Sequence, residues 1–303
     1  MKINIFKMLF NFEQFTFENK PRTKEEYKHI IKIIKNDIIK SLALAGSGHS
    51  GGAIGITDLM AVLFFGGVMQ YNPTVPQWEL RDKFILSPGH YSPVLYSCLA
   101  RAGYFEIKEL STLRKLGSRL QGHPLGAGIL PGNETTSGSL GQGISIAVGM
   151  AMNNKLIDKI DSKVFCLTGD GELQEGSCWE AAMSASMYSL NNLCWIVDNN
   201  NCQIDGRLED VMSIYPLAEK FHSFGFNVIE IDGHNVPQII DAFNRFISFS
   251  LSSNESSKPT CIIAKTQMGN GISFMQDNYK WHGIPPTWEQ AELALKELDK
   301  YYM

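Results

Sequence analysis

Two polar segments that follow predicted strands carry residue types suited to holding a metal ion and a diphosphate. The first is Gly-Asp-Gly at residues 169–171, and the second is VDNNNCQIDG at residues 197–206. Asp170 and Asn200 offer hard oxygens, the Cys202 carbonyl offers a third, and magnesium accepts such a set. The two glycines of the first segment let the backbone approach phosphate oxygens closely. Either segment alone is more often a simple turn, but their order, strand-GDG-helix-strand-DNN, favours a metal-diphosphate site.

Four histidines lie in glycine-rich or proline-containing loops, where side chains have no helix or strand packing to satisfy. They are His49 in GSGHSGG, His90 in SPGH, His123 in GHP and His282 in WHG. Neutral imidazole can donate, accept or relay a proton near physiological pH, so these residues are candidates for acid-base chemistry. The remaining histidines occupy helix or plain loop contexts and receive no predicted role; they are His29, His222 and His234.

The composition predicts a globular protein and excludes several functional classes. Hydrophobic residues make up 44% and charged residues 19% of the 303 residues, and the net charge is -4. This balance argues against disorder, a membrane span or a broad nucleic-acid-binding surface. The six cysteines are scattered without a CxxC pair, which favours a reduced, cytoplasmic protein. Lys7 interrupts the apolar N-terminus, so we expect residues 1–22 to form a short arm and not a signal peptide.

Strand and helix patterns alternate along the rest of the chain, residues 23–303, which we expect to form a single domain. TKEE at residues 23–26 resembles a capping box before a helix that ends at Gly46. Apolar strand patterns then recur at residues 84–87, 164–168, 193–198, 227–232 and 260–266, with helical patterns between them. Strict alternation predicts right-handed crossovers and a parallel sheet with helices on both faces, an α/β doubly wound fold. Both polar segments should then meet at one crevice, outside the carboxyl ends of the strands.

Taken together, these motifs resemble the transketolase family. The resemblance runs from about Lys40 to Pro286 and includes GSGHSGGAIGITDLM, LSPGH, GHP, ETTSGSLGQGISIAVGMA, the GDG and DNN segments, and WHGIPP. It implies the thiamine-diphosphate-binding fold. It also implies thiamine diphosphate and Mg²⁺, or Ca²⁺ or Mn²⁺ in its place, as cofactors, and two-carbon ketol transfer from a ketose phosphate to an aldose phosphate as the activity.

The resemblance implies specific roles for the cofactor-site residues. Asp170, Asn200 and the Cys202 carbonyl match the metal ligands, while Gly171 and His90 match positions near the diphosphate. Gly138 and Leu140 match positions whose backbone contacts the aminopyrimidine. Glu175 matches an acid at a dimer contact that links two active sites. Lys265 is a weaker candidate for closing the site over the cofactor. Glu175 is equally well explained as a carboxylate favoured at a helix start.

Three histidines take catalytic roles under the same resemblance. His49 and His282 match residues near the ketose hydroxyl that is deprotonated as the carbon-carbon bond breaks, and His123 matches the residue that holds the terminal hydroxyl of the two-carbon unit. Ser50 and Ser139 depart from the family pattern, since many members have proline at these positions. Both changes should loosen the loops slightly without removing a catalytic group.

The family normally continues into a pyrimidine-binding domain whose glutamate activates the cofactor, and no segment of this sequence resembles that domain. We therefore expect a split enzyme in which a C-terminal partner subunit supplies the glutamate, in a heterotetramer with two copies of each chain. Alternatives are a split transketolase acting on sulfofructose or apulose phosphate, another thiamine-diphosphate enzyme such as a 1-deoxyxylulose-5-phosphate synthase or a 2-oxo acid dehydrogenase component, and a non-catalytic scaffold. A simple nucleotide-binding domain is disfavoured because no GxGxxG follows the first predicted strand.

Overall fold

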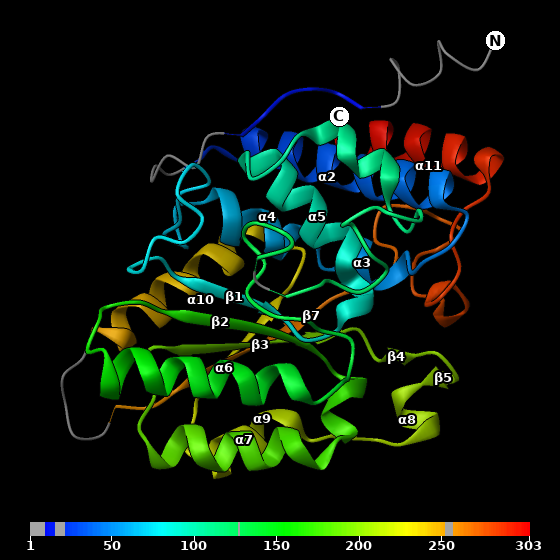
Figure 1. The fold of residues 1–303 in the computed structure, drawn as a ribbon. Helices are drawn as coiled ribbons and strands as arrows, with labels where there is room; N and C mark the ends of the chain where they lie inside the picture. The colour runs from blue at the N-terminus through cyan, green and yellow to red at the C-terminus, as the bar shows by residue number, and fades with distance from the viewer. Residues whose placement is uncertain (1–9, 16–21, 127, 252–256) are drawn as a thin grey trace.

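The computed structural model describes residues 10–15, 22–126, 128–251 and 257–303. Its centre is a five-stranded sheet in the order β1-β2-β3-β7-β6, and every neighbouring pair of strands is parallel (Figure 1). The strands of this sheet are β1 Lys83–Leu86, β2 Val164–Gly169, β3 Leu193–Asn199, β6 Asn227–Asp232 and β7 Thr260–Lys265. A small antiparallel hairpin, β4 Cys202–Gln203 with β5 Gly206–Arg207, follows β3.

Helices cover both faces of the sheet (Figure 1). One layer contains α2 Lys24–Ala45, α3 Gly51–Gly55, α4 Thr57–Phe65, α5 Ser92–Ala102, α10 Val236–Ser250 and α11 Trp288–Tyr301. The opposite layer contains α6 Gln142–Met152, α7 Gly176–Met187 and α9 Leu217–Ser223, while the short α8 Leu208–Val211 follows the hairpin. The predicted doubly wound α/β fold with helices on both faces is thus confirmed.

The two-residue period of the strands explains why two cores form. In β2, Phe165 and Leu167 point into the core beneath α2, α4 and α10, whereas Val164 and Cys166 point into the core formed with α6 and α7. All four side chains are buried, as expected for a parallel sheet covered on both faces. The strands therefore read as continuous apolar runs in the sequence.

Local signals set the ends of α2, as the sequence predicts. The Thr23 side chain accepts a hydrogen bond from the Glu26 N–H and the Glu26 side chain accepts one from the Thr23 N–H, which completes the predicted capping box. Gly46 adopts a left-handed conformation, φ 61°, at the other end. The helix therefore ends at Ala45, four residues before His49, and the chain continues toward the sheet edge.

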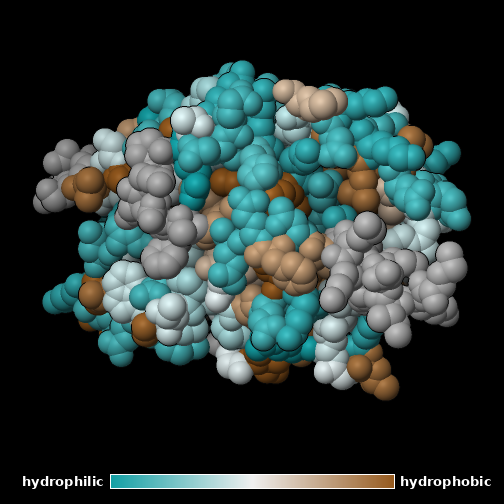
Figure 2. Space-filling view, turned by 90° about the horizontal axis from the view of Figure 1, so that it is seen from above, coloured by the Kyte–Doolittle hydropathy of each residue, from teal (hydrophilic) through white to brown (hydrophobic). Residues whose placement is uncertain are grey.

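The described part of the N-terminal segment, residues 10–15, lies against α2 and α5. Phe10 and Phe15 are buried. The Arg101 guanidinium donates to the Asn11 and Glu13 carbonyls, both at 2.7 Å, and pairs with Asp37. The rest of the predicted arm, apart from Arg22, lies outside the described residues. Seen from the side of α2 and α11, the surface is mainly hydrophilic with small, separate hydrophobic areas (Figure 2).

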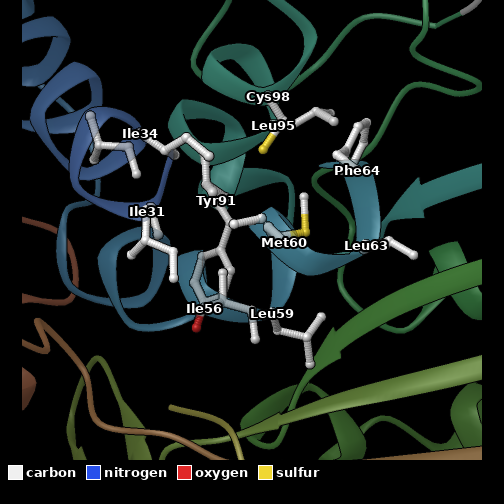
Figure 3. Close-up of a cluster of buried hydrophobic side chains, with 14 of the residues drawn as sticks. Ile31, Ile34, Ile56, Leu59, Met60, Leu63, Phe64, Tyr91, Leu95 and Cys98 are labelled. Carbon is white, nitrogen blue, oxygen red and sulfur yellow. The ribbon is translucent and has the colours of Figure 1, made fainter. Parts of the chain in front are cut away.

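Tyr91 connects the hydrophobic core beneath α2 to the candidate site. Figure 3 shows the Tyr91 ring among Ile31, Ile56 and Met60, with its hydroxyl at the end nearer the sheet. That hydroxyl donates to the Asp198 carboxylate at the end of β3, at 2.8 Å. Hydrophobic packing of the ring thus fixes a polar contact at the carboxyl edge of the sheet.

Candidate functional site

A cavity of about 390 Å³ lies at the carboxyl edge of the sheet and collects most of the predicted site residues. Those that line it are His49, His90, His123, Gly138, Leu140, Asp170, Gly171, Glu175, Cys202 and His282. They come from the segments directly after β1, β2 and β3 and from three further segments, which carry His49, residues 123–140 and His282. The segments that carry α3 and β4 lie toward the same side of the molecule (Figure 1). This is the crevice position that parallel α/β sheets offer to ligands.

The four predicted histidines form one cluster in this cavity. Ring centroids are 5.1 Å apart for His49 and His90, 5.8 Å for His49 and His282, and 6.2 Å for His49 and His123. The His90 and His282 centroids are 5.0 Å apart. Because the rings lie within one small volume, a bound molecule can contact several of them at once.

Burial keeps these imidazoles neutral. Burial, with smaller contributions from His282, Arg114 and His123, lowers the pKa of His49 to about 4. Burial also lowers the pKa of His90, His123 and His282. The buried Nδ1 of His282 has no hydrogen-bond partner among the described residues. The cluster can therefore accept protons or hydrogen bonds from a ligand at neutral pH.

The GDG segment forms the opposite wall of the cavity. The Asp170 carboxylate accepts from the Gly171 N–H at 2.8 Å and from the Asn201 N–H at 2.6 Å, so it ties the end of β2 to the segment after β3. A methyl group added at Gly169 would meet no atom within 4 Å, and one at Gly171 would first meet Gln203 at 3.5 Å. The backbone is thus open to a ligand here. Burial and the nearby Asp198 charge raise the pKa of Asp170 to about 8, an electrostatic cost that a cation would relieve.

Asn200 lies beside this wall and does not line the cavity itself. Its amide donates to Asp198 at 2.8 Å and to the Tyr91 hydroxyl at 3.2 Å, and its Oδ1 accepts from the Cys202 N–H at 2.9 Å. These contacts fix the orientation of the amide. In the described part of the chain no three His, Cys, Asp or Glu side chains form a metal-binding group. The metal ligands predicted from the sequence differ from such a group, because they comprise one carboxylate (Asp170), one side-chain amide (Asn200) and one backbone carbonyl (Cys202).

Gly138, Leu140 and Glu175 lie on the loops beside the histidines. Gly138 has φ +140°, and a Cβ there would come within 3.1 Å of the His123 ring, so only glycine fits without strain. Leu140 is 39% exposed, and Glu175 is exposed at the N-cap of α7 without a side-chain capping bond. The helix-start interpretation of Glu175 therefore lacks a direct hydrogen bond.

Lys265 does not join the other predicted residues. It ends β7, its side chain is 68% exposed, and its Nζ lies 3.9 Å from Glu230 on the neighbouring strand. It does not line the cavity.

Two buried carboxylates that the sequence analysis did not select support the site. Asp198 accepts from Tyr91, Asn200 and the Thr266 hydroxyl. Glu172 lines the cavity and accepts from the Ser87 hydroxyl, from the Gly141 N–H at 2.8 Å and from the Gly169 N–H at 3.2 Å. Glu172 directly follows the GDG segment, and Asp198 is the last residue of the predicted strand 193–198, so their positions at strand ends are the signal that could have identified them.

Comparisons with known proteins agree with this geometry. Residues 24–298 match the family model described as transketolase, thiamine diphosphate binding domain. The chain is 40% identical to human transketolase over 262 residues, which cover 86% of this chain but 40% of that protein. It therefore spans less than half the length of this relative. The crystal structure of transketolase from Campylobacter jejuni superposes with a TM-score of 0.79 at 34% identity, and the match covers 91% of this chain and 42% of that chain.

Two shorter relatives match over nearly their whole length. An apulose-4-phosphate transketolase subunit of Phocaeicola vulgatus is 38% identical, with 87% of this chain and 90% of that protein covered. The 6-deoxy-6-sulfo-D-fructose transketolase subunit SqwG of a Clostridium species is 36% identical, with 91% and 97% covered. Among the helices that the structure describes, none combines the length and apolar character needed to cross a bilayer.

Proposed function

The chain belongs to the transketolase family, and we propose that it is the N-terminal subunit of a two-chain transketolase. Its reaction would be Mg²⁺- and thiamine-diphosphate-dependent transfer of a two-carbon ketol unit from a ketose phosphate to an aldose phosphate. The observation that carries the proposal is the single cavity that holds the GDG wall on one side and four neutral histidines on the other.

The GDG wall fits a metal-diphosphate group. Asp170, Asn200 and the Cys202 carbonyl would hold Mg²⁺, or Ca²⁺ or Mn²⁺, and both Asp170 oxygens keep acceptor capacity beyond their backbone bonds. The open backbone at Gly169 and Gly171 leaves room for the diphosphate oxygens. When bound, thiamine diphosphate supplies the electron sink for cleavage and formation of the carbon-carbon bond.

The histidine cluster supplies proton control and orientation. His49 and His282 would accept the proton of the ketose hydroxyl as the donor bond breaks, because both rings line the cavity and are neutral. His123 would hold the terminal hydroxyl of the two-carbon unit. His90, the most buried of the four, would face the cofactor diphosphate.

A second chain would complete the site. The two relatives that match over 90% and 97% of their length carry subunit names, which supports a partner for this chain as well. That partner would supply the pyrimidine domain and the catalytic glutamate, in a cytoplasmic heterotetramer. The names of these relatives also support a second candidate donor, apulose phosphate or sulfofructose, in place of a pentose phosphate.

Two-carbon transfer assays test the proposal. Xylulose 5-phosphate and ribose 5-phosphate, with magnesium and thiamine diphosphate, would be supplied to this chain alone and to the chain co-purified with the product of the neighbouring gene. We expect turnover only in the mixture, and the Asp170→Asn chain in the same mixture serves as a matched control that should be inactive. Full turnover by the single chain would refute the partner requirement. If the mixture is active with sulfofructose or apulose phosphate as donor but inactive with xylulose 5-phosphate, the second candidate donor is selected.

A further inference from the structure

The segment between β7 and α11, residues 266–287, delivers His282 to the cavity and contains only one short helical turn, Tyr279–Trp281. Such a segment must be held by contacts with its surroundings. The Gly269 N–H donates to the Gly51 carbonyl at 2.8 Å, and the Ser50 hydroxyl donates to the Ile284 carbonyl at 2.8 Å. Both contacts join the segment to α3 and its N-cap, directly after His49.

The contact with α3 is too close for side chains to separate the two backbones. A Cβ at Gly55 would lie 2.8 Å from the Gln267 carbonyl oxygen, and one at Gly51 would overlap the Met268 side chain. Any shift of residues 267–269 therefore moves against α3. Because His49 and His282 extend from the two sides of this contact, such a shift would change their 5.8 Å separation.

His234 holds the start of this segment. It follows the end of β6, which pairs in parallel with β7, so the loops after the two strands run side by side. The Gln267 N–H donates to His234 Nε2 at 2.8 Å. A ring nitrogen that accepts a hydrogen bond carries no proton, so the neutral ring must carry its proton on Nδ1.

The other ring nitrogen faces a buried ion pair. His234 Nδ1 lies 3.5 Å from Asp58 Oδ2, and the Lys35 ammonium lies 3.2 Å from the same oxygen. The side chains of Lys35, Asp58 and His234 are 0%, 7% and 15% exposed. Lys35 also donates to the Asn270 side chain at 2.9 Å and to its carbonyl at 3.1 Å. His234 and Lys35, which both contact Asp58, therefore bind Gln267 and Asn270 at the start of the segment.

We propose that His234 is a positioning residue for the catalytic cavity: as the Nδ1–H tautomer it links Asp58 to the Gln267 backbone and thereby fixes the segment that carries His282. The catalytic consequence rests on the function proposed above, whereas the tautomer and the contact do not. The role resembles that of an outer-shell group that orients a ligand-binding residue without touching the ligand.

The tautomer can be measured on this chain alone. Long-range ¹H–¹⁵N correlation spectra of histidine-labelled protein, assigned with a His234→Gln sample, distinguish a protonated from an unprotonated ring nitrogen. We expect an unprotonated Nε2 and a protonated Nδ1 for His234. The opposite tautomer would overturn the proposal, because its Nε2–H could not accept from Gln267.

Two near-isosteric variants separate the two contacts. His234→Gln places an amide oxygen near the Nε2 position and can keep the Gln267 bond, whereas His234→Asn reaches only the Asp58 side. In the two-chain enzyme we expect kcat to fall about tenfold to a hundredfold for His234→Asn, with a smaller change in KM, and to stay within about threefold for His234→Gln. His222→Asn, an exposed change on α9, is the matched control.

The His282 ring signals provide a readout that needs no turnover. They should move in His234→Asn and keep their wild-type positions in His234→Gln and His222→Asn. Unchanged His282 signals in folded His234→Asn would refute the positioning role. If the wild-type pair shows no transfer with any donor, the proposed function fails, and the tautomer and the His282 signals still decide the role of His234.

Discussion

Replacing His49 by glutamine should make the chain less sensitive to mild acid. His49 is neutral in the folded chain because burial, together with the neighbouring His282, Arg114 and His123, lowers its pKa to about 4. In the unfolded chain the same ring titrates near its ordinary value. A pKa that is depressed by folding gives stability that is present above the unfolded value and is lost as the pH falls toward the folded value.

The size of the effect follows from the linkage relation. A fully buried histidine with this shift would cost about 2 kcal/mol of unfolding free energy between about pH 7.5 and pH 5. The His49 ring is partly open to the cavity, and solvent screening reduces the effect by roughly half. We therefore expect the wild-type chain to lose about 1 kcal/mol more than His49→Gln over this interval.

Urea unfolding at the two pH values measures this difference. The comparison with wild type is necessary because burial raises the pKa of Asp170 to about 8 and of Glu172 to about 7, and these carboxyls change stability in the opposite direction with pH. His222→Gln, on the exposed surface of α9, is the control and should follow wild type. An equal loss of stability in wild type and His49→Gln would refute the view that the cavity keeps this ring neutral.

Other substitutions test the cofactor wall, the loop geometry and the buried ion pairs. Asp170→Asn should weaken magnesium-dependent thiamine diphosphate binding by the chain pair at least about tenfold, because the wall loses its charged ligand; titration calorimetry measures it, and unchanged affinity would exclude Asp170 as a ligand. Lys265→Ala should leave that affinity within about twofold, since its side chain is 68% exposed and outside the cavity. Gly138→Ala should destabilise the chain by about 1–3 kcal/mol, because φ is +140° and the new Cβ would press on the His123 ring; a urea midpoint equal to that of wild type would contradict this. Arg101→Met should cost about 3–5 kcal/mol in the same assay by leaving the buried Asp37 unpaired, and an undiminished midpoint would show that Asp37 is not ionised.

Much of the fold and part of the site follow from local sequence signals. The capping box at Thr23 depends on residues three positions apart, and the strands appear as short continuous apolar runs, so neighbouring residues are sufficient to reveal both. The GDG and DNN segments could be assigned to one crevice because the carboxyl ends of parallel strands share an edge. The roles assigned to Asp170, Asn200, Cys202 and the four histidines remain predictions that the assays above address.

The tertiary structure decided which residues of each segment face the cavity and what holds them there. Lys265 lies outside the cavity, Asn200 lies beside the GDG wall without lining the cavity, and the buried Glu172 and Asp198 accept hydrogen bonds that hold this wall and Asn200 in place. His234, which no sequence pattern singled out, reaches the Gln267 backbone across 33 residues, and Ser50 reaches Ile284 across 234. Residue type and spacing reveal which groups can do chemistry, because these are properties of short stretches of chain. Side-chain direction and long-range hydrogen bonds depend on how distant backbones pack, and no local pattern contains that information.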